Sequence, residues 1–165
     1  MSAKGVAAAS AAVAGLIMAA GAGHGGHHRG ISAVLDSLGA IPYGSAYTPS
    51  SWASAFLRAA GERRTSCNRR FVIAWEAAEG GAWDNDATGN PLDTTQREPG
   101  SYAINSIGVQ AYPSWHEGLR ASVVTLGNGG YPGIISCLQA GDDAQACADA
   151  VAASGWGTEP FTATC

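Results

Sequence analysis

The sequence predicts a mainly helical domain whose helices are interrupted by a long polar loop or a short β-hairpin. Apolar residues recur at helical spacing on both sides of residues 82–106, and this central stretch is rich in Asn, Asp, Thr, Gly and Pro, which favour turns. The chain shows neither an internal repeat nor the alternation of strands and helices that a parallel sheet requires. Its 165 residues suffice for one domain with its own hydrophobic core.

Residues 1–46 differ in composition from the rest of the chain. Residues 6–22 carry no charge, follow Lys4 and end in small residues, a pattern typical of a secretory signal with a cleavage site at residues 20–22. A flexible Ala/Gly tether or an interface helix in a larger assembly is the alternative. The segment is also a candidate for membrane association, although it has few strongly apolar residues for a membrane span. The leader therefore favours a secreted or cell-envelope location.

A glycine- and histidine-rich linker follows at residues 23–30. Histidine is a common metal ligand, but the intervening glycines impose no fixed geometry, so we interpret this segment as a flexible linker and predict neither a metal nor a cofactor. Residues 31–38 have a short helical pattern, and Pro42 and Pro49 then interrupt the chain. The folded domain is expected to span residues 47–165.

Five helices are expected in this domain, with a brief extended segment at residues 107–112. Ser50 or Ser51 is expected to cap the first helix, and Ser114 the third. In the second helix, the spacing of Phe71, Ile73, Ala74 and Ala78 places most of the surface against the core. The helices are expected, in order, at residues 52–60, 71–79, 115–126, 131–140 and 143–153.

The four cysteines favour disulfide bonds over zinc binding, because they form an even set without the closely spaced pairs of zinc modules. Cys137 and Cys147 lie ten residues apart on consecutive expected helices, which leaves Cys67 to pair with Cys165. This pairing is a preference, since four cysteines allow three connectivities. Four buried thiols in a reducing compartment are the alternative.

The charge balance argues against a nucleic-acid partner. Charged residues make up 13% of the chain and the formal net charge is −4, whereas binding to phosphate backbones requires clustered Lys and Arg. The longest basic run, residues 62–70, flanks an expected helix start and is interpreted as a solvated helix end.

Glu79 stands out because it ends an apolar helix and is followed by two glycines. A carboxyl at the negative end of the helix dipole, beside Trp75 or Trp83, is expected to have a raised pKa. A carboxylic acid that stays protonated near neutral pH can protonate the leaving oxygen in glycoside cleavage. Glu76 is the rival acid, and its alternative role is a cap or a structural salt bridge with Arg69 or Arg70.

Five short segments, in this order and spacing, resemble the transglycosylase-type lysozyme-like domains of phage tail-associated and secreted actinobacterial proteins. They are AEGGAW (78–83), NPLDTTQ (90–96), NSIGVQAY (105–112), SWHEG (114–118) and SGWGT (154–158), and the resemblance spans about residues 47–161. It implies an α+β lysozyme-like fold in which the loop or hairpin forms one wall of a sugar-binding groove. It also implies cleavage of peptidoglycan at the β-1,4 bond between MurNAc and GlcNAc, in a secreted, cell-envelope or virion-associated protein that works alone or in a phage tail or envelope assembly.

By this resemblance Glu79 matches the general acid/base, Gln110 matches the groove glutamine of soluble lytic transglycosylases, and Tyr112 and Asn105 match groove-lining residues. Two departures from the family pattern bear on the groove: Gly80 stands where serine is usual, and the glycine of the glutamine motif is shifted by one residue.

Aromatic residues in loop context are expected to stack on sugar rings, because a ring face suits the apolar side of a pyranose. Trp83, Tyr102 and Tyr112 are the candidates, whereas helical spacing assigns Trp75 and Trp115 to the core, and Trp156 is expected to pack as well.

The mechanism depends on a second carboxylate, for which Asp84, Asp86 and Asp93 are candidates that are equally natural as turn residues. With one, the domain is a muramidase. Without one, Glu79 acts alone and gives a 1,6-anhydro product, as in a lytic transglycosylase. Two other classes compete: a non-catalytic wall-binding or virion structural module with the same fold, and a Cys/His hydrolase, which is weakly supported because His116 is the one histidine in the domain.

Overall fold

The computed structural model describes residues 47–165, apart from the side chains of Ala82 and Asp84. The expectations for the leader, the histidine-rich linker and the helix at residues 31–38 therefore lie outside the described residues, as does the side chain of the candidate Asp84. Within residues 47–165, no helix combines the length and the apolar character that crossing a membrane requires.

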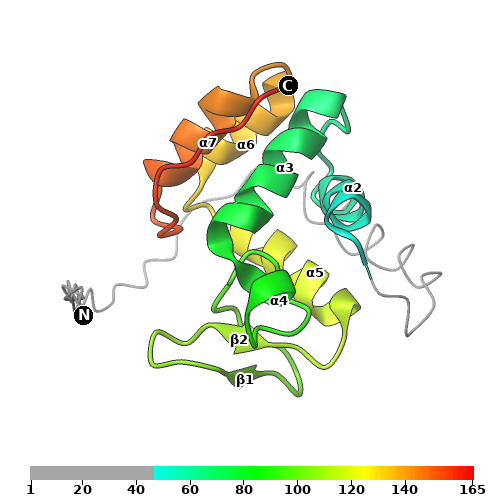
Figure 1. Cartoon of the computed structure of the whole chain (residues 1–165), viewed down its shortest axis with the longest axis vertical. Helices are drawn as coiled ribbons and strands as arrows, with labels where there is room; N and C mark the ends of the chain where they lie inside the picture. The colour runs from blue at the N-terminus through cyan, green and yellow to red at the C-terminus, as the bar shows by residue number, and fades with distance from the viewer. Residues whose placement is uncertain (1–46) are drawn as a thin grey trace, which may run out of the picture.

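The described domain is mainly helical, as predicted, and contains a short antiparallel hairpin. Figure 1 shows α3 crossing the middle of the domain, with α6 and α7 on one side, α2 and α5 on the other, and the hairpin beyond the end of α3. The elements are α2 (Pro49–Ala59), α3 (Ser66–Glu79), α4 (Gly81–Asp84), β1 (Tyr102–Ala103), β2 (Gln110–Ala111), α5 (Trp115–Leu126), α6 (Pro132–Ala140) and α7 (Ala144–Ala152).

The helix starts follow the capping side chains. Ser114 caps α5, as predicted, by accepting a hydrogen bond from the backbone N–H of Glu117. The expected cap of α2 at Ser50 or Ser51 is wrong: Thr48 is the cap, Pro49 takes the first helical position, and Ser51 completes a capping box. Proline suits this position because a backbone N–H there would have no intrahelical acceptor, so the helix loses no hydrogen bond.

Helix α3 begins at Ser66, five residues before the predicted start, because the side chain of Thr65 caps it. Its buried face also differs from the predicted one, since Ala78 is exposed and Ile73 and Ala74 are only half-buried. The buried positions recur as adjacent pairs every four residues, which is the helical repeat of one broad face covering about half of the helix surface. They are Cys67, Asn68, Phe71, Val72, Trp75 and Glu76.

The central polar stretch is more ordered than the sequence predicts. It opens with the short helix α4 in place of a loop, because the left-handed Gly80 (φ 66°) ends α3 and lets the chain turn at once into another helical turn. The hairpin is confirmed: β1 pairs with β2 in the register Tyr102 with Ala111 and Ala103 with Gln110.

Aromatic rings link the helices to the C-terminal segment. Trp75 is fully buried, as predicted, and packs edge-on against Trp156 with ring centroids 4.7 Å apart. Trp115 is half-buried and stacks on Trp83 at 4.8 Å. Two disulfides, Cys67–Cys165 and Cys137–Cys147, complete the fold and confirm the preferred pairing.

Candidate functional site

The carboxyl group of Glu79 lies at the C-terminal end of α3 and is half-buried. Its Oε1 accepts a hydrogen bond from Trp75 Nε1 at 3.1 Å and a second one from the hydroxyl of Thr158. Trp75 Nε1 also lies 3.2 Å from Thr158 Oγ1, so the three side chains form one closed cluster. Glu79 is thus held in one position by the core and by the C-terminal segment.

The surroundings of Glu79 favour its protonated form. Burial raises the pKa of this carboxyl, the hydrogen bonds from Thr158 and Trp75 lower it, and the negative charge of Asp93 raises it, so that the pKa lies above its ordinary value. The direction agrees with the sequence-based expectation, but the contribution of Trp75 has the opposite sign, because its N–H donates to the charged form.

Glu76 is a buried carboxyl with an incomplete set of partners. It is 1% exposed, its Oε2 accepts a hydrogen bond from Trp83 Nε1 at 3.0 Å, and its Oε1 has no partner among the described residues. Burial raises its pKa to about 8. The alternative role in a salt bridge with Arg69 or Arg70 is wrong, because the one ion pair among residues 47–165 joins Glu98 to Arg120. Both arginines of α3 are exposed, and Arg70 donates to the carbonyl of Cys165.

The sequence suggests that Trp83 lies in a loop, but the structure places it in α4. The structure directs its ring onto Trp115 and its indole N–H to Glu76, and the side chain remains half-buried. Tyr47 adds a third ring, 5.7 Å from that of Trp115. These three rings form a continuous aromatic cluster, which the hydrogen bond from Trp83 to Glu76 connects to α3.

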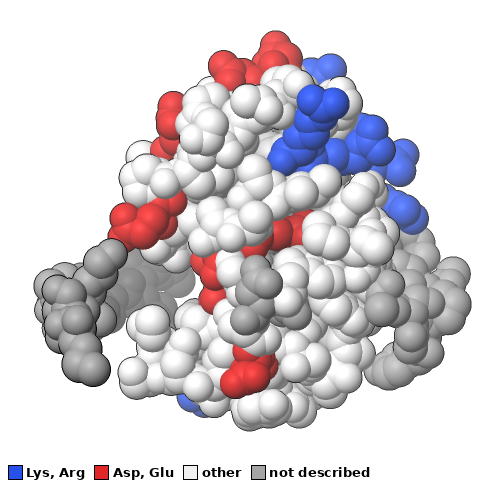
Figure 2. Space-filling model, in the orientation of Figure 1, with Lys and Arg blue, Asp and Glu red and all other residues white. Residues whose placement is uncertain are grey.

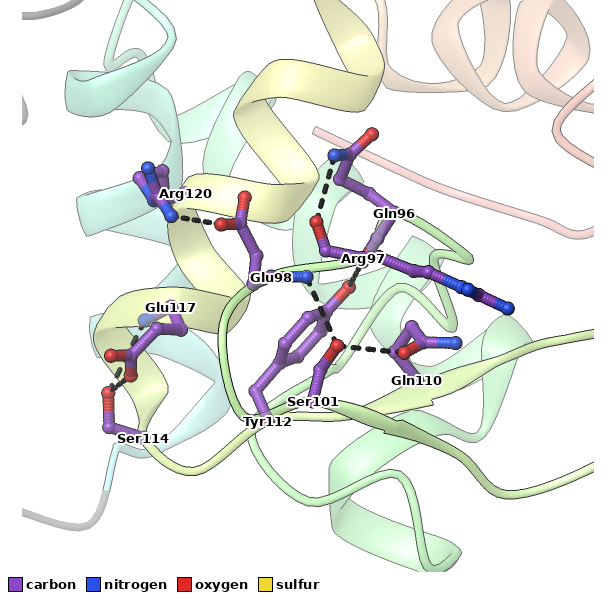
Figure 3. Close-up of polar contacts among 9 residues, drawn as sticks. All are labelled: Gln96, Arg97, Glu98, Ser101, Gln110, Tyr112, Ser114, Glu117 and Arg120. Atoms are coloured by element: carbon purple, nitrogen blue, oxygen red, sulfur yellow. Dashed lines mark hydrogen bonds and ion pairs between the residues drawn. The ribbon is translucent and has the colours of Figure 1, made fainter.

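Two predicted groove residues use their side chains to hold the hairpin together. Gln110 is 2% exposed, accepts from Ser101 Oγ at 2.8 Å and donates to the carbonyl of Gly108 at 2.7 Å. Figure 3 shows Ser101 and Gln110 facing each other, and Tyr112 pointing its hydroxyl to the carbonyl of Gln96, which it contacts at 2.6 Å.

The other two predicted groove residues of the hairpin lie at the surface. Asn105 is exposed, but its Oδ1 accepts the backbone N–H groups of Gly108 and Val109 and so shapes the turn. Tyr102 is 63% exposed, and nothing in the described residues covers its ring. Of the five predicted substrate-binding residues, Tyr102 is therefore the one whose ring is most available to a ligand.

An open pocket of about 280 Å³ lies on the hairpin. Its lining includes Gln110 and Tyr102, which the sequence predicts as site residues. The other four lining residues are not predicted, because they belong to no motif. One of these, Glu98, forms an ion pair with Arg120, and its carboxyl is 7% exposed. The lining consists of Arg97, Glu98, Ser101, Tyr102, Ala103 and Gln110.

Charged side chains are unevenly distributed over the surface. Figure 2 shows basic side chains gathered at the end where α3 begins, whereas acidic side chains lie beside them at the top, along one edge and across the middle of the same face. The exposed arginines of that end are Arg58, Arg63, Arg64, Arg69 and Arg70.

Within residues 47–165, no three His, Cys, Asp or Glu side chains are grouped so that they could bind a metal ion. Comparisons with protein-family models, curated proteins and solved structures found no match for the chain. The arrangement of Glu79, its donors and the hairpin therefore carries the functional interpretation.

Proposed function

We propose that the domain cleaves the glycan strands of peptidoglycan at the β-1,4 bond between MurNAc and GlcNAc, with Glu79 as the general acid. The observation that supports this most directly is a half-buried carboxyl with a raised pKa, held by two side-chain donors at the end of a core helix. Glycosidases require such a carboxyl, because the leaving oxygen must receive a proton as the bond to the anomeric carbon breaks.

The hydrogen bonds of Glu79 indicate which oxygen carries the proton. Trp75 and Thr158 both donate to Oε1, so in the protonated acid this oxygen acts as an acceptor and the proton is placed on Oε2. Two fixed donors also limit the rotation of the carboxyl group. Glu79 is therefore already oriented to deliver a proton in one direction, and no reorganisation of its carboxyl group is needed during the reaction.

The hairpin supplies the second element of the proposal, a surface for the sugar chain. The exposed ring of Tyr102 suits the apolar face of a pyranose, and the pocket beside it is also lined by the exposed Arg97, whose guanidinium can donate hydrogen bonds to hydroxyl and carbonyl oxygens. Two disulfides are compatible with the secreted or cell-envelope location in which this substrate is found.

A non-catalytic module that binds peptidoglycan, alone or in a phage tail or envelope assembly, is the second candidate. It is favoured by one observation: the pocket on the hairpin does not include Glu79, so a ligand can bind there without reaching the acid. In this alternative Glu79 is a structural residue that ties α3 to the C-terminal segment.

Incubation of the full chain with purified peptidoglycan, followed by mass spectrometry of the soluble fragments, tests the proposal. We expect fragments from the unmodified protein and a loss of about 100-fold or more in Glu79→Gln, since general acids contribute about 100- to 10,000-fold. Glu159→Gln is the matched control, because Glu159 is an exposed glutamate. Binding without fragments from the unmodified protein would leave the non-catalytic module as the function.

A further inference from the structure

We propose that Asp93 is the second carboxylate of the site and that it activates the water molecule that attacks the sugar. This inference rests on the proposed glycan cleavage and makes the reaction a hydrolysis. Three sets of contacts carry it: those that bring residues 90–94 to the end of α3, those that fix the backbone around Asp93, and those that orient its carboxyl group.

Residues 90–94 lie directly against the end of α3. A Cβ atom on Gly81 would lie 2.4 Å from the carbonyl oxygens of both Asn90 and Pro91, so the two backbones are in close contact two residues after Glu79. On the other side, Trp156 packs on Trp75, which donates to Glu79, and donates its own indole N–H to the carbonyl of Leu92 at 3.1 Å. Asp93 therefore belongs to the same part of the molecule as Glu79.

The backbone on both sides of Asp93 is fixed. Asn90 is fully buried, and its side chain binds the N–H of Thr94 at 3.0 Å, the carbonyl of Thr94 at 2.9 Å and the carbonyl of Gln110 at 2.7 Å. Leu92 is also fully buried, and Thr94 is 3% exposed. Asp93 itself is half-buried, so it is the member of this segment whose side chain remains accessible.

Asp93 also has an unusual backbone conformation. Its φ of 45° lies in the left-handed region, and among the described residues it is the one non-glycine residue there. Aspartate tolerates this conformation better than most residues, but such positions persist only where the surroundings impose them, and they are common at functional sites.

The carboxyl group of Asp93 is oriented without being neutralised. Asn85 Nδ2 lies 3.1 Å from one of its oxygens and 3.3 Å from the other. Among the described residues, Asp93 forms no ion pair. The negative charge of Asp93 raises the pKa of Glu79, yet the two carboxyls hydrogen-bond to different partners. Each carboxyl is therefore held independently of the other, as the separate roles of acid and base require.

The step is balanced as follows. Water attacks the anomeric carbon of MurNAc while Asp93 accepts one of its protons, and Glu79 gives its proton to the glycosidic oxygen as the bond between carbon and that oxygen breaks. The products are a free reducing end on MurNAc, initially in the inverted α configuration, and a free hydroxyl on GlcNAc. Burial raises the pKa of Asp93, which makes its carboxylate a stronger base.

Product analysis of the unmodified full chain is the primary test, because it needs no variant to fold. In water enriched in heavy oxygen, we expect reducing ends that carry the heavy isotope, and proton NMR of the first product should show the α anomer. Anhydro ends or a β anomer would overturn the role of Asp93 and leave glycan cleavage by Glu79 intact. No cleavage at all would overturn the proposed function instead.

The variants Asp93→Asn and Asp142→Asn provide the matched comparison, since Asp142 is an exposed aspartate to which no role in the site is assigned. We expect a loss of about 100-fold or more from the first and unchanged cleavage from the second. In Asp93→Ala, added azide should restore turnover and give a glycosyl azide, because azide attacks without needing a base. Wild-type activity in Asp93→Asn would overturn the proposal, as would a loss in Asp93→Ala that azide does not restore while circular dichroism shows an intact fold.

Discussion

Trp75 donates its indole N–H to Oε1 of Glu79, 3.1 Å away and one helical turn further along α3. Trp75 is fully buried between Phe71 and Trp156, so the carboxyl at the helix end is bound to a residue whose own position is fixed by the core. The position of the proposed acid therefore depends on packing as well as on the local backbone. Substitutions of the residues that contact the Glu79 carboxyl should therefore change its pKa while the fold is retained.

Replacing Thr158 by valine should raise the pKa of Glu79 further. The hydroxyl of Thr158 donates to Glu79 Oε1, and a hydrogen bond to the charged form lowers the pKa, so removing it favours the protonated acid. Carbon-13 NMR titration of the Glu79 carboxyl measures this directly. If the domain cleaves glycans, the alkaline limb of its pH profile should move in the same direction.

Thr158→Ser is the matched control, because it keeps the hydroxyl group and removes only a methyl group. Its titration should stay close to that of the unmodified protein. A lower pKa of Glu79 in Thr158→Val would contradict the role assigned to this hydrogen bond.

Replacing Glu76 by glutamine should stabilise the protein at alkaline pH. Burial raises the pKa of Glu76 from its ordinary 4.5 to about 8, so the folded state holds a proton that the unfolded chain releases. The unmodified protein therefore loses stability as the pH rises between these values, by roughly 3 to 5 kcal/mol at about 1.4 kcal/mol per pH unit. Glutamine carries no such proton, and this loss should be absent.

Urea unfolding of both proteins between pH 4 and pH 9 measures the effect. Glu159→Gln serves as the control, because an exposed glutamate should leave the pH dependence unchanged. Parallel stability curves for Glu76→Gln and the unmodified protein would show that Glu76 titrates normally and is not desolvated.

Glu76 illustrates where the sequence pattern was misread. The sequence predicts a buried face of α3 that includes Ala78, and it gives Glu76 the role of a rival acid or, alternatively, of a cap or a structural salt bridge with Arg69 or Arg70. The actual face repeats as residues 67 and 68, 71 and 72, and 75 and 76, which places Glu76 in the core. This repeat can be read from the sequence, but it requires accepting a charged residue at a buried position, against the usual preference.

The helices and the hairpin could be predicted because they depend on local patterns: apolar spacing, a capping serine at position 114, and turn-forming residues in the central stretch. The cap of α2 was misplaced by two or three residues because Thr48 and Ser51 act together. The placement of Asp93 could not be predicted, because it depends on contacts of Asn90 and Leu92 with distant segments. From the sequence alone, Asp93 was indistinguishable from a turn residue.

Substituting Gly81 by alanine should disturb the contact between α3 and residues 90–94. The added methyl group would lie 2.4 Å from two backbone carbonyl oxygens, a distance that cannot be relieved by rotating a side chain. We expect a loss of roughly 2 kcal/mol or more in the free energy of unfolding. If Asp93 acts as proposed, cleavage should fall as well.

Gly155→Ala is the matched control, because nothing lies within 4 Å of the corresponding Cβ position. Its stability should stay within about 0.5 kcal/mol of the unmodified protein. Equal stabilities for the two variants would mean that the segment of Asp93 is not packed against the end of α3.

Removing the Cys67–Cys165 disulfide should cost more stability than removing Cys137–Cys147. The bonds span 98 and 10 residues, and the chain-entropy model gives about 5 kcal/mol for the longer loop and about 3 kcal/mol for the shorter one. The paired serine variants are well matched, since each removes one buried and one more exposed sulfur. Urea unfolding under oxidising conditions should show this order, and equal costs would indicate residual structure in the unfolded chain.

Gln110→Ala and Tyr102→Ala should separate the structural and the binding roles of the hairpin. The side chain of Gln110 makes two hydrogen bonds, to Ser101 and Gly108, and the residue is 2% exposed, so its loss should cost about 1 to 3 kcal/mol of stability. Tyr102 is 63% exposed, so its truncation should leave stability within about 0.5 kcal/mol and weaken the binding of soluble glycan fragments by roughly 5- to 10-fold. Val124→Ala, at an exposed apolar residue of α5, should change neither property.

Urea unfolding and isothermal titration calorimetry measure the two effects. A stable Gln110→Ala protein that no longer binds glycan would instead assign Gln110 the ligand contact that the family resemblance implies.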